Sequence, residues 1–271
     1  KAKIRQDFAE GKIGRSALLK GESGSYHSPG TCTFYGTANS NQMLMEIMGM
    51  QLPGSSFVNP DTAMRTGLNR EAVQTLINNV KIKDINRSVG YIIDEKAIVN
   101  GVIGLLATGG STNHTLHLIA IAKAAGIKLT WQDFSDLASV IPLITRIYPN
   151  GPADVNHFHA AGGMAFVIYT LLENGLLHED VNTILGKGLR NYTKDPKLDE
   201  KNINYVDGPV QSLNEKIIRS AQSPFDKTGG LKVLIGNIGT AIIKTSAVDP
   251  SHHAVEAQAI VFDDQDDLIT Q

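Results

Sequence analysis

The stretch YIIDEKAIVNGVIGLLAT (residues 91–108) decides the expected fold, because it is apolar on nearly all sides after its acidic start. A helix that is hydrophobic all round is a buried one, so this stretch predicts a helix at the centre of a domain. Gly101 and Gly104 would let a neighbouring element approach closely, at some cost in helix stability. The same apolar surface would also suit a contact between subunits, and the pattern leaves both interpretations open.

Apolar periodicity on either side of this stretch predicts a mainly helical domain with two short strands. The expected helices cover 4–20 in two pieces, 41–48, a region from 59 to about 83, 115–125, 130–140 and 163–174; the expected strands cover 127–130 and 142–148. From Gly229 onward, β-branched runs at 231–236, 240–248 and 257–262 alternate with Gly, Asn and Asp-Pro turns, a pattern typical of strands. We therefore expect an α/β fold. Residues 1–228 would form the C-terminal part of a helix-rich domain, and residues 229–271 would open an all-β, barrel-like second domain that is truncated.

The composition is that of an ordinary soluble globular protein, with 42% hydrophobic and 19% charged residues among 271. The formal net charge is −2 and the Lys and Arg residues are scattered, so we expect neither nucleic acid nor a membrane surface as a partner. No apolar run reaches transmembrane length, and the N-terminal residues lack the apolar core of a signal peptide. One cysteine cannot form an internal disulfide, which is typical of a reducing compartment, and we expect the cytoplasm.

That single cysteine, Cys32, lies between two turn signals and a predicted helix. The turn 28–30 (Ser-Pro-Gly) precedes it, Gly36 follows it, and Thr37 or Asn39 could cap the methionine-rich helix 41–48. We expect Cys32 on a tight loop directed at this helix N-terminus, where free N–H groups and the helix dipole favour a thiolate. The alternative is a buried cysteine that packs as a small hydrophobe, and the Gly, Thr, Tyr and Asn neighbours leave both interpretations open.

A second polar turn, GGSTNH (residues 109–114), separates two predicted helices. Its backbone N–H groups and two hydroxyls would suit a carboxylate or phosphate, although Ser111 or Thr112 could equally serve as a plain helix cap. His114 and His117 lie three residues apart, which with Asp154 suggests a zinc hydrolase as an alternative. Asp154 is better explained as a cap at the start of the next helix.

Four segments together resemble the iron–sulfur-dependent dehydratases of the dihydroxy-acid and phosphogluconate dehydratase family. They are the Cys32 loop, the turn 109–117, the run YPNGPAD (148–154), and the run 236–247, which contains GNIG and KTSA. The resemblance covers essentially the whole chain. Thr33 stands where the dihydroxy-acid branch typically carries a second glycine after the cysteine, so the chain looks like the phosphogluconate branch.

The resemblance implies an iron–sulfur cluster, 4Fe–4S rather than 2Fe–2S, ligated by cysteines from separate parts of the chain. Cys32 matches the last of these cysteines, and no other is present among the 271 residues. The chain begins at Lys1, and 259–264 has the pattern of a strand that stops as it begins to pair, so we expect a window cut from a longer protein. The remaining cysteines, the Mg²⁺ ligands and the catalytic base are expected outside it. The window alone should therefore be inactive.

The implied activity is dehydration of 6-phospho-D-gluconate to 2-keto-3-deoxy-6-phosphogluconate and water, a step of the Entner-Doudoroff pathway. A cluster iron would act as a Lewis acid on the departing hydroxyl. By the same resemblance, Ser111, Thr112 and Asn113 are candidates for substrate contact, and relatives in the family are commonly dimers. The alternatives are another sugar-acid or dihydroxy-acid dehydratase, or a cluster-free sugar-phosphate binding protein in which Cys32 merely packs.

Overall fold

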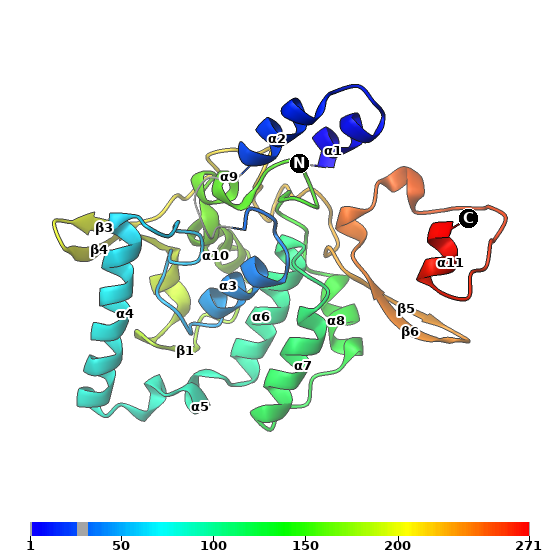
Figure 1. Ribbon diagram of the computed structural model, residues 1–271. Helices are drawn as coiled ribbons and strands as arrows, with labels where there is room; N and C mark the ends of the chain where they lie inside the picture. Colours follow the sequence, from blue (N-terminus) through cyan, green and yellow to red (C-terminus); the bar gives the residue numbers. More distant parts are fainter. Residues whose placement is uncertain (1, 26–31, 271) are drawn as a thin grey trace.

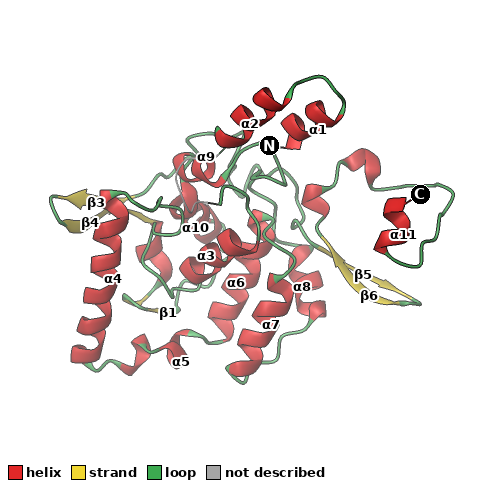
Figure 2. Cartoon of the chain, in the orientation of Figure 1, coloured by secondary structure: helices red, strands yellow, loops and turns green. Residues whose placement is uncertain are grey.

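The computed structural model describes residues 2–25 and 32–270, which form a helix-rich body (Figures 1 and 2). About 46% of the residues are helical. The helices are α1 (Ala2–Ala9), α2 (Arg15–Ser23), α3 (Thr37–Ile47), α4 (Ala63–Ile82), α5 (Val89–Ile92), α6 (Glu95–Thr108), α7 (His114–Ala124), α8 (Trp131–Ala138), α9 (Val155–Ala160), α10 (Gly163–Glu173) and α11 (Gln265–Thr270). Within the described ranges, no helix has both the length and the apolar character needed to cross a membrane.

Helix α6 occupies the centre of the body, as predicted, with α3, α7 and α8 packed against it (Figure 1). Its residues from Val102 to Thr108 are all buried. The predicted stretch 91–108 is divided in two, because the Asp94 side chain accepts a hydrogen bond from the Ala97 N–H (2.8 Å) and starts a new helix there. Since α6 is enclosed by its own chain, it is a core helix and not a subunit contact.

The two glycines of α6 set how closely α3 approaches. A Cβ atom built on Gly104 would lie 2.9 Å from both Ile47 Cδ1 and Met43 Sδ, and one on Gly101 would lie 2.9 Å from Met48 Sδ. Met43, Ile47 and Met48 are fully buried. These side chains therefore fill the space that larger residues on α6 would need.

Three two-stranded antiparallel sheets complete the fold. The short strands β1 (Asn182–Thr183) and β2 (Gly186–Lys187) form one, β3 (Lys194–Asp199) and β4 (Asn202–Asp207) the second, and β5 (Lys232–Gly236) and β6 (Gly239–Ile243) the third. The hairpin β3–β4 contacts α4, and Leu198 and Ile203 pack around Gly67 of that helix.

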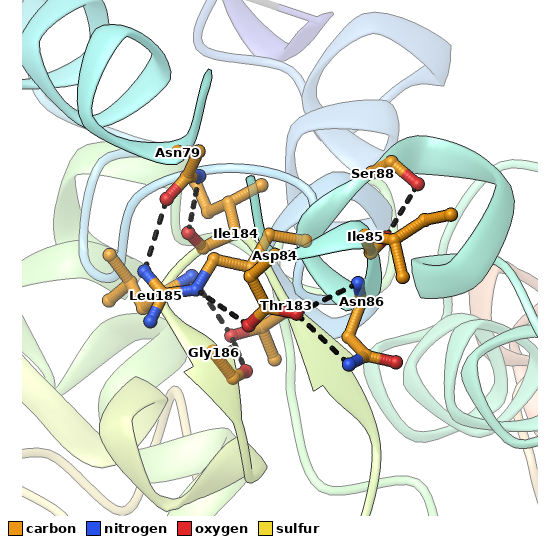
Figure 3. Close-up of polar contacts among 10 residues, drawn as sticks. Asn79, Asp84, Ile85, Asn86, Ser88, Thr183, Ile184, Leu185 and Gly186 are labelled. Atoms are coloured by element: carbon orange, nitrogen blue, oxygen red, sulfur yellow. Dashed lines mark hydrogen bonds and ion pairs between the residues drawn. The ribbon is translucent and has the colours of Figure 1, made fainter. Parts of the chain in front are cut away.

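A polar network fastens the C-terminal end of α4 to the turn between β1 and β2 (Figure 3). The Asn79 side chain donates to the Ile184 carbonyl (2.8 Å) and accepts from Arg87 Nη1 (3.1 Å). Asp84 accepts from the Asn86 backbone N–H (3.1 Å) and lies 3.4 Å from Arg87 Nε. With β3–β4 also packed against it, α4 is held along one side.

Three of the strand predictions are wrong. Residues 127–130 form an irregular connection between α7 and α8, and 257–262 is irregular and exposed except for the partly buried Phe262. Residues 142–148 form only isolated bridges, of Leu143 with Asp226, Thr145 with Ile218 and Ile147 with Ala153. An apolar extended run becomes a strand only where a second strand accepts its hydrogen bonds, and the partners here are single positions.

The expected β-rich region after Gly229 is a single hairpin in the part of the chain that the structure describes. After β6 the chain continues through short 3₁₀ turns at Thr245–Ala247 and Pro250–His252 and ends in α11. The turn Thr245–Ala247 stays against the helical body, where Ser246 bonds Asn150, and Figure 1 shows the chain after it extending away from that body. Strands β5 and β6 lie where strands were predicted, but the described residues show no barrel.

Replacement of Gly104 by Ala should destabilise the protein, because the added methyl group meets the buried Ile47 and Met43 side chains. Gly90 is a matched control, since nothing lies within 4 Å of a Cβ built there and it is also helical. Both variants replace a helical glycine by alanine, so the difference reports mainly the overpacking. We expect Gly104→Ala to be about 1–3 kcal/mol less stable than Gly90→Ala in chemical denaturation. Equal stabilities would contradict the packing described here.

Candidate functional site: the Cys32 cavity

Cys32 lies on an exposed loop that enters α3 and borders a cavity of about 240 Å³. Its Sγ atom is 3.7 Å from the Phe34 carbonyl oxygen. The Asn39 side chain donates to the Cys32 and Phe34 carbonyls, both at 2.7 Å, and so holds the loop over the first turn of α3. The cysteine is therefore not packed as a small hydrophobe. The predicted turn 28–30 lies outside the described residues.

The prediction that Thr37 or Asn39 caps α3 is wrong. Gly36 is the N-cap residue and offers no side chain, while the Asn39 side chain is occupied by the Cys32 loop. The N-terminal N–H groups of α3 therefore have no side-chain cap, and this positive end of the helix follows directly after the cysteine. The predicted position of Cys32 just before a helix N-terminus is confirmed.

The turn 109–114 docks on the same end of α3. Thr37 Oγ1 lies 2.9 Å from Ser111 Oγ and accepts a hydrogen bond from Asn113 Nδ2 (2.8 Å). The Ser111 backbone N–H donates to Ser40 Oγ (3.2 Å). Ser111 and Asn113 are thus engaged with α3, whereas no hydrogen bond of the Thr112 hydroxyl is recorded among the described residues. None of these three side chains caps α7, which begins at His114.

The run 148–154 supports the Cys32 loop from the other side. The Tyr35 N–H donates to the Tyr148 carbonyl (2.9 Å), and the Phe34 and Tyr148 rings meet edge to face with centroids 5.5 Å apart. Asn150 Nδ2 donates to the Gly109 carbonyl (2.7 Å), at the C-terminal end of α6. This run therefore connects the cysteine loop to the polar turn.

Ser246, from the C-terminal region, completes the arrangement. Its hydroxyl donates to Asn150 Oδ1 (3.0 Å), and its Oγ would lie only 2.9 Å from a Cβ on Gly109. Gly109 has a φ of +58°, so both its backbone conformation and its surroundings favour glycine. The four segments quoted in the sequence analysis thus meet at one end of α3 and α6.

Cys32 fits the role of one ligand in an iron–sulfur cluster. A cluster needs accessible thiolates, and Cys32 is exposed at the edge of a partly polar cavity. A four-cysteine ligand set needs three more thiolates, which the 271 residues do not contain. No carboxylate is among the described residues that line the cavity, so these residues supply no acidic ligand for Mg²⁺.

The zinc alternative gains no support from the histidines. The rings of His114 and His117 lie 5.4 Å apart, and burial lowers the pKa of His114. Asp154 accepts hydrogen bonds from the N–H groups of Asn156 and His157, both at 3.0 Å, and caps α9. Within the described ranges, no three His, Cys, Asp or Glu side chains come together as a metal site.

Two charged residues outside the predicted site fix the loop 54–58, which forms part of the cavity wall. Glu46 is fully buried; its Oε1 accepts the Gly54 N–H (2.6 Å), and its Oε2 accepts the Ser56 N–H (3.2 Å) and hydroxyl. Arg65 donates from Nη2 to the carbonyls of Ser55 (2.7 Å) and Val58 (2.6 Å). The Glu46 carboxylate thus accepts hydrogen bonds from the N–H groups of the loop, and the Arg65 guanidinium donates hydrogen bonds to its carbonyls.

The family profile described as "Dihydroxy-acid/6-phosphogluconate dehydratase N-terminal" matches residues 1–192, and the corresponding C-terminal profile matches residues 216–271. The chain belongs to the dihydroxy-acid/6-phosphogluconate dehydratase family. The resemblance seen in the sequence is therefore confirmed.

Members of this family from several bacteria are similar along almost the whole chain. A phosphogluconate dehydratase of Rhizobium meliloti is 58% identical over 99% of this chain, and one of Escherichia coli (strain K12) is 54% identical over 99%. A dihydroxy-acid dehydratase of Caldanaerobacter subterraneus is 32% identical over 96%. The chain spans 44–45% of the length of these relatives.

The buried Glu46 carboxyl should make stability depend on pH. Burial, with a smaller contribution from Asp195, raises its pKa to about 7 despite the hydrogen bonds from the loop. The folded state then holds a proton that the unfolded chain releases, so this contribution to the unfolding free energy is fully present below the unfolded pKa and is lost as pH rises through about 7.

Glu46→Gln removes this dependence, with exposed Glu95→Gln as the control. Denaturant titrations at about pH 5 and about pH 8 measure it. We expect the unfolding free energy of the wild type, relative to that of Glu46→Gln, to be smaller at about pH 8 than at about pH 5. Relative to Glu95→Gln, it should be the same at both pH values. The same difference for both variants would contradict a buried Glu46 carboxyl.

Proposed function

We propose that the protein to which this chain belongs is a hydro-lyase that dehydrates 6-phospho-D-gluconate to 2-keto-3-deoxy-6-phosphogluconate and water, in the Entner-Doudoroff pathway. The supporting observation is the contrast between 52–58% identity to phosphogluconate dehydratases and 32% to a dihydroxy-acid dehydratase. Because the chain spans less than half of these relatives, the activity is proposed for the whole protein, and the 271 residues alone are expected to be inactive.

The reaction removes a proton from C2 and hydroxide from C3 of the sugar acid, which leaves an enol that tautomerises to the 2-keto acid. An iron–sulfur cluster, proposed as 4Fe–4S, supplies when bound a Lewis acid for the departing hydroxyl, and Mg²⁺ would neutralise the carboxylate. Cys32 is the proposed cluster ligand of this chain. Its loop is held by Asn39 and backed by Tyr148, so the sulfur is kept in place before any ligand binds.

We further propose that the turn Ser111, Thr112 and Asn113 contacts the substrate. Ser111 and Asn113 form hydrogen bonds with Thr37, which leaves the Thr112 hydroxyl as the group available to a substrate oxygen. In this arrangement Thr112 binds, while Ser111 and Asn113 keep the turn in position. The acidic Mg²⁺ ligands and the general base are proposed to lie outside this chain.

The remaining proposals concern organisation. We propose two domains, 1–228 and 229–271, because β5 starts soon after this boundary, and a cytoplasmic location, because a ligating thiol must stay reduced. A small sugar-acid phosphate is the proposed partner, with neither nucleic acid nor a membrane. A homodimer is proposed because Leu76 and Val80 of α4, which line a cavity of about 590 Å³, are 65% and 69% exposed; light scattering on the full-length protein tests this.

Replacement of Cys32 by Ser should remove iron from the full-length protein, because a hydroxyl is a poor ligand for cluster iron. We expect dehydratase activity to fall by at least about 100-fold together with the bound iron. Thr33→Ser is the matched control, since it changes the adjacent side chain and keeps the thiol. If Cys32→Ser retained iron and activity, Cys32 would be structural and the proposed site wrong.

The substrate is tested by anaerobic formation of 2-keto acid by the full-length protein. The competing substrates are 6-phosphogluconate, D-gluconate and 2,3-dihydroxyisovalerate. We expect turnover of 6-phosphogluconate in clear preference to the other two. Preference for 2,3-dihydroxyisovalerate or for an unphosphorylated sugar acid would move the protein to another branch of the family, and binding without turnover would favour a sugar-phosphate binding protein.

A further inference from the structure

We propose that Arg65 binds the phosphate group of the substrate inside the Cys32 cavity. This inference rests on the proposed function and names the residue that would select a phosphorylated sugar acid. It is carried by the charge of the cavity, by the hydrogen bonds that orient the guanidinium, and by the loop that holds it in place.

Arg65 is the one cation among the described residues that line the Cys32 cavity, and that lining contains no carboxylate. Gln42 and Asn59 add side-chain amides to the same wall, which suit the hydroxyl groups of a polyol. A second, larger cavity of about 590 Å³ meets the first at Gln42 and Arg65. The guanidinium therefore lies where an elongated anionic ligand could reach it from the side of Cys32.

The hydrogen bonds that Arg65 donates to the protein use only part of its guanidinium group. Nε donates to the Val58 carbonyl (3.2 Å), and Nη2 donates to the carbonyls of Val58 and Ser55. No protein acceptor for Nη1 is recorded in the described part of the chain, and no carboxylate there forms an ion pair with Arg65. Carbonyl oxygens satisfy donors but do not neutralise the charge, so this partly buried cation still favours an anion.

The loop that orients Arg65 is itself rigidly held. Glu46 binds the N–H groups of Gly54 and Ser56, the residues on either side of Ser55, whose carbonyl accepts from Arg65. Thr62 caps the first turn of α4 by accepting from the Arg65 N–H (3.1 Å). Both the backbone and the side chain of Arg65 are therefore fixed before a ligand binds, which lowers the entropy cost of binding.

The phosphate is the substrate anion that fits this position. In a sugar-acid phosphate the carboxylate is attached to C2, next to the reacting C2–C3 bond, whereas the phosphate lies at the far end of the carbon chain. When the departing hydroxyl of the substrate lies near Cys32, the phosphate end of its carbon chain extends away from Cys32, toward another part of the cavity wall. A planar guanidinium also matches the geometry of phosphate oxygens.

The test uses the full-length protein, with Arg65→Gln and Arg65→Lys as variants and Arg70→Gln as the control. Arg70 lies on the same helix, donates to the Lys201 carbonyl (3.0 Å) and is exposed. The measurements are kcat/KM for 6-phosphogluconate and for D-gluconate, and the dissociation constant of inorganic phosphate by calorimetry. Circular dichroism and thermal unfolding confirm that each variant folds.

We expect Arg65→Gln to lower kcat/KM for 6-phosphogluconate by about 10- to 100-fold and to change that for D-gluconate by less than about threefold. Phosphate binding should weaken by a factor of about 10 or more. Arg65→Lys, which keeps the charge but loses the fork, should fall between the wild type and Arg65→Gln, and Arg70→Gln should match the wild type.

An equal loss of kcat/KM for 6-phosphogluconate and D-gluconate would overturn the assignment. Arg65 would then support the loop or bind the substrate carboxylate, which both substrates share. Unchanged phosphate binding in a folded Arg65→Gln variant would overturn it as well. A wild-type protein that does not turn over 6-phosphogluconate contradicts the proposed function instead, so the two failures are distinguishable.

Discussion

The close approach of α3 to α6 is the constraint on which the rest of the structure depends. Gly101 and Gly104 allow Met43, Ile47 and Met48 to pack directly against α6. One end of α3 follows the Cys32 loop, and the corresponding end of α6 leads into the polar turn 109–114. The packing of α3 on α6 that builds the core therefore also brings the Cys32 thiol close to the turn 109–114.

A second layer of polar contacts turns this packing into a defined cavity. Glu46 projects from α3 and Arg65 from α4, and they hold the N–H groups and the carbonyls of the same loop. A buried carboxylate is costly by itself, and here three donors offset part of that cost. The result is a cavity wall whose backbone is held from both helices and whose one cation forms no ion pair with a carboxylate of the described residues.

The sequence predicted those parts of the fold that depend on local pattern. The stretch 91–108 is apolar all round, and such a surface can be satisfied only by burial, so α6 was found from its own residues. The strand predictions at 127–130 and 257–262 failed because a strand requires a partner, which an isolated apolar run does not specify. The cap predictions for Thr37 and Asn39 failed for a related reason. Thr37 bonds Ser111, 74 residues away in sequence, and Asn39 bonds the Cys32 loop.

The site was predictable where residue type carries the chemistry. Cys32 stands out because it is the one thiol of the chain, whereas its exposure became visible only in three dimensions. Glu46 had a signal, a charged residue inside an apolar helix, and Arg65 had none, because an arginine in the first turn of a helix is ordinary. What distinguishes Arg65 is the set of carbonyls around it, which come from a loop whose course the sequence does not specify.

The most direct test of this account is an iron anomalous-scattering map from anaerobically grown crystals of the full-length protein in the presence of 6-phosphogluconate. We expect an iron peak within bonding distance of Cys32 Sγ, with the substrate in the cavity beside it. A structure with iron bound elsewhere and Cys32 without a metal ligand would contradict the central claim that this chain supplies a cluster ligand through Cys32.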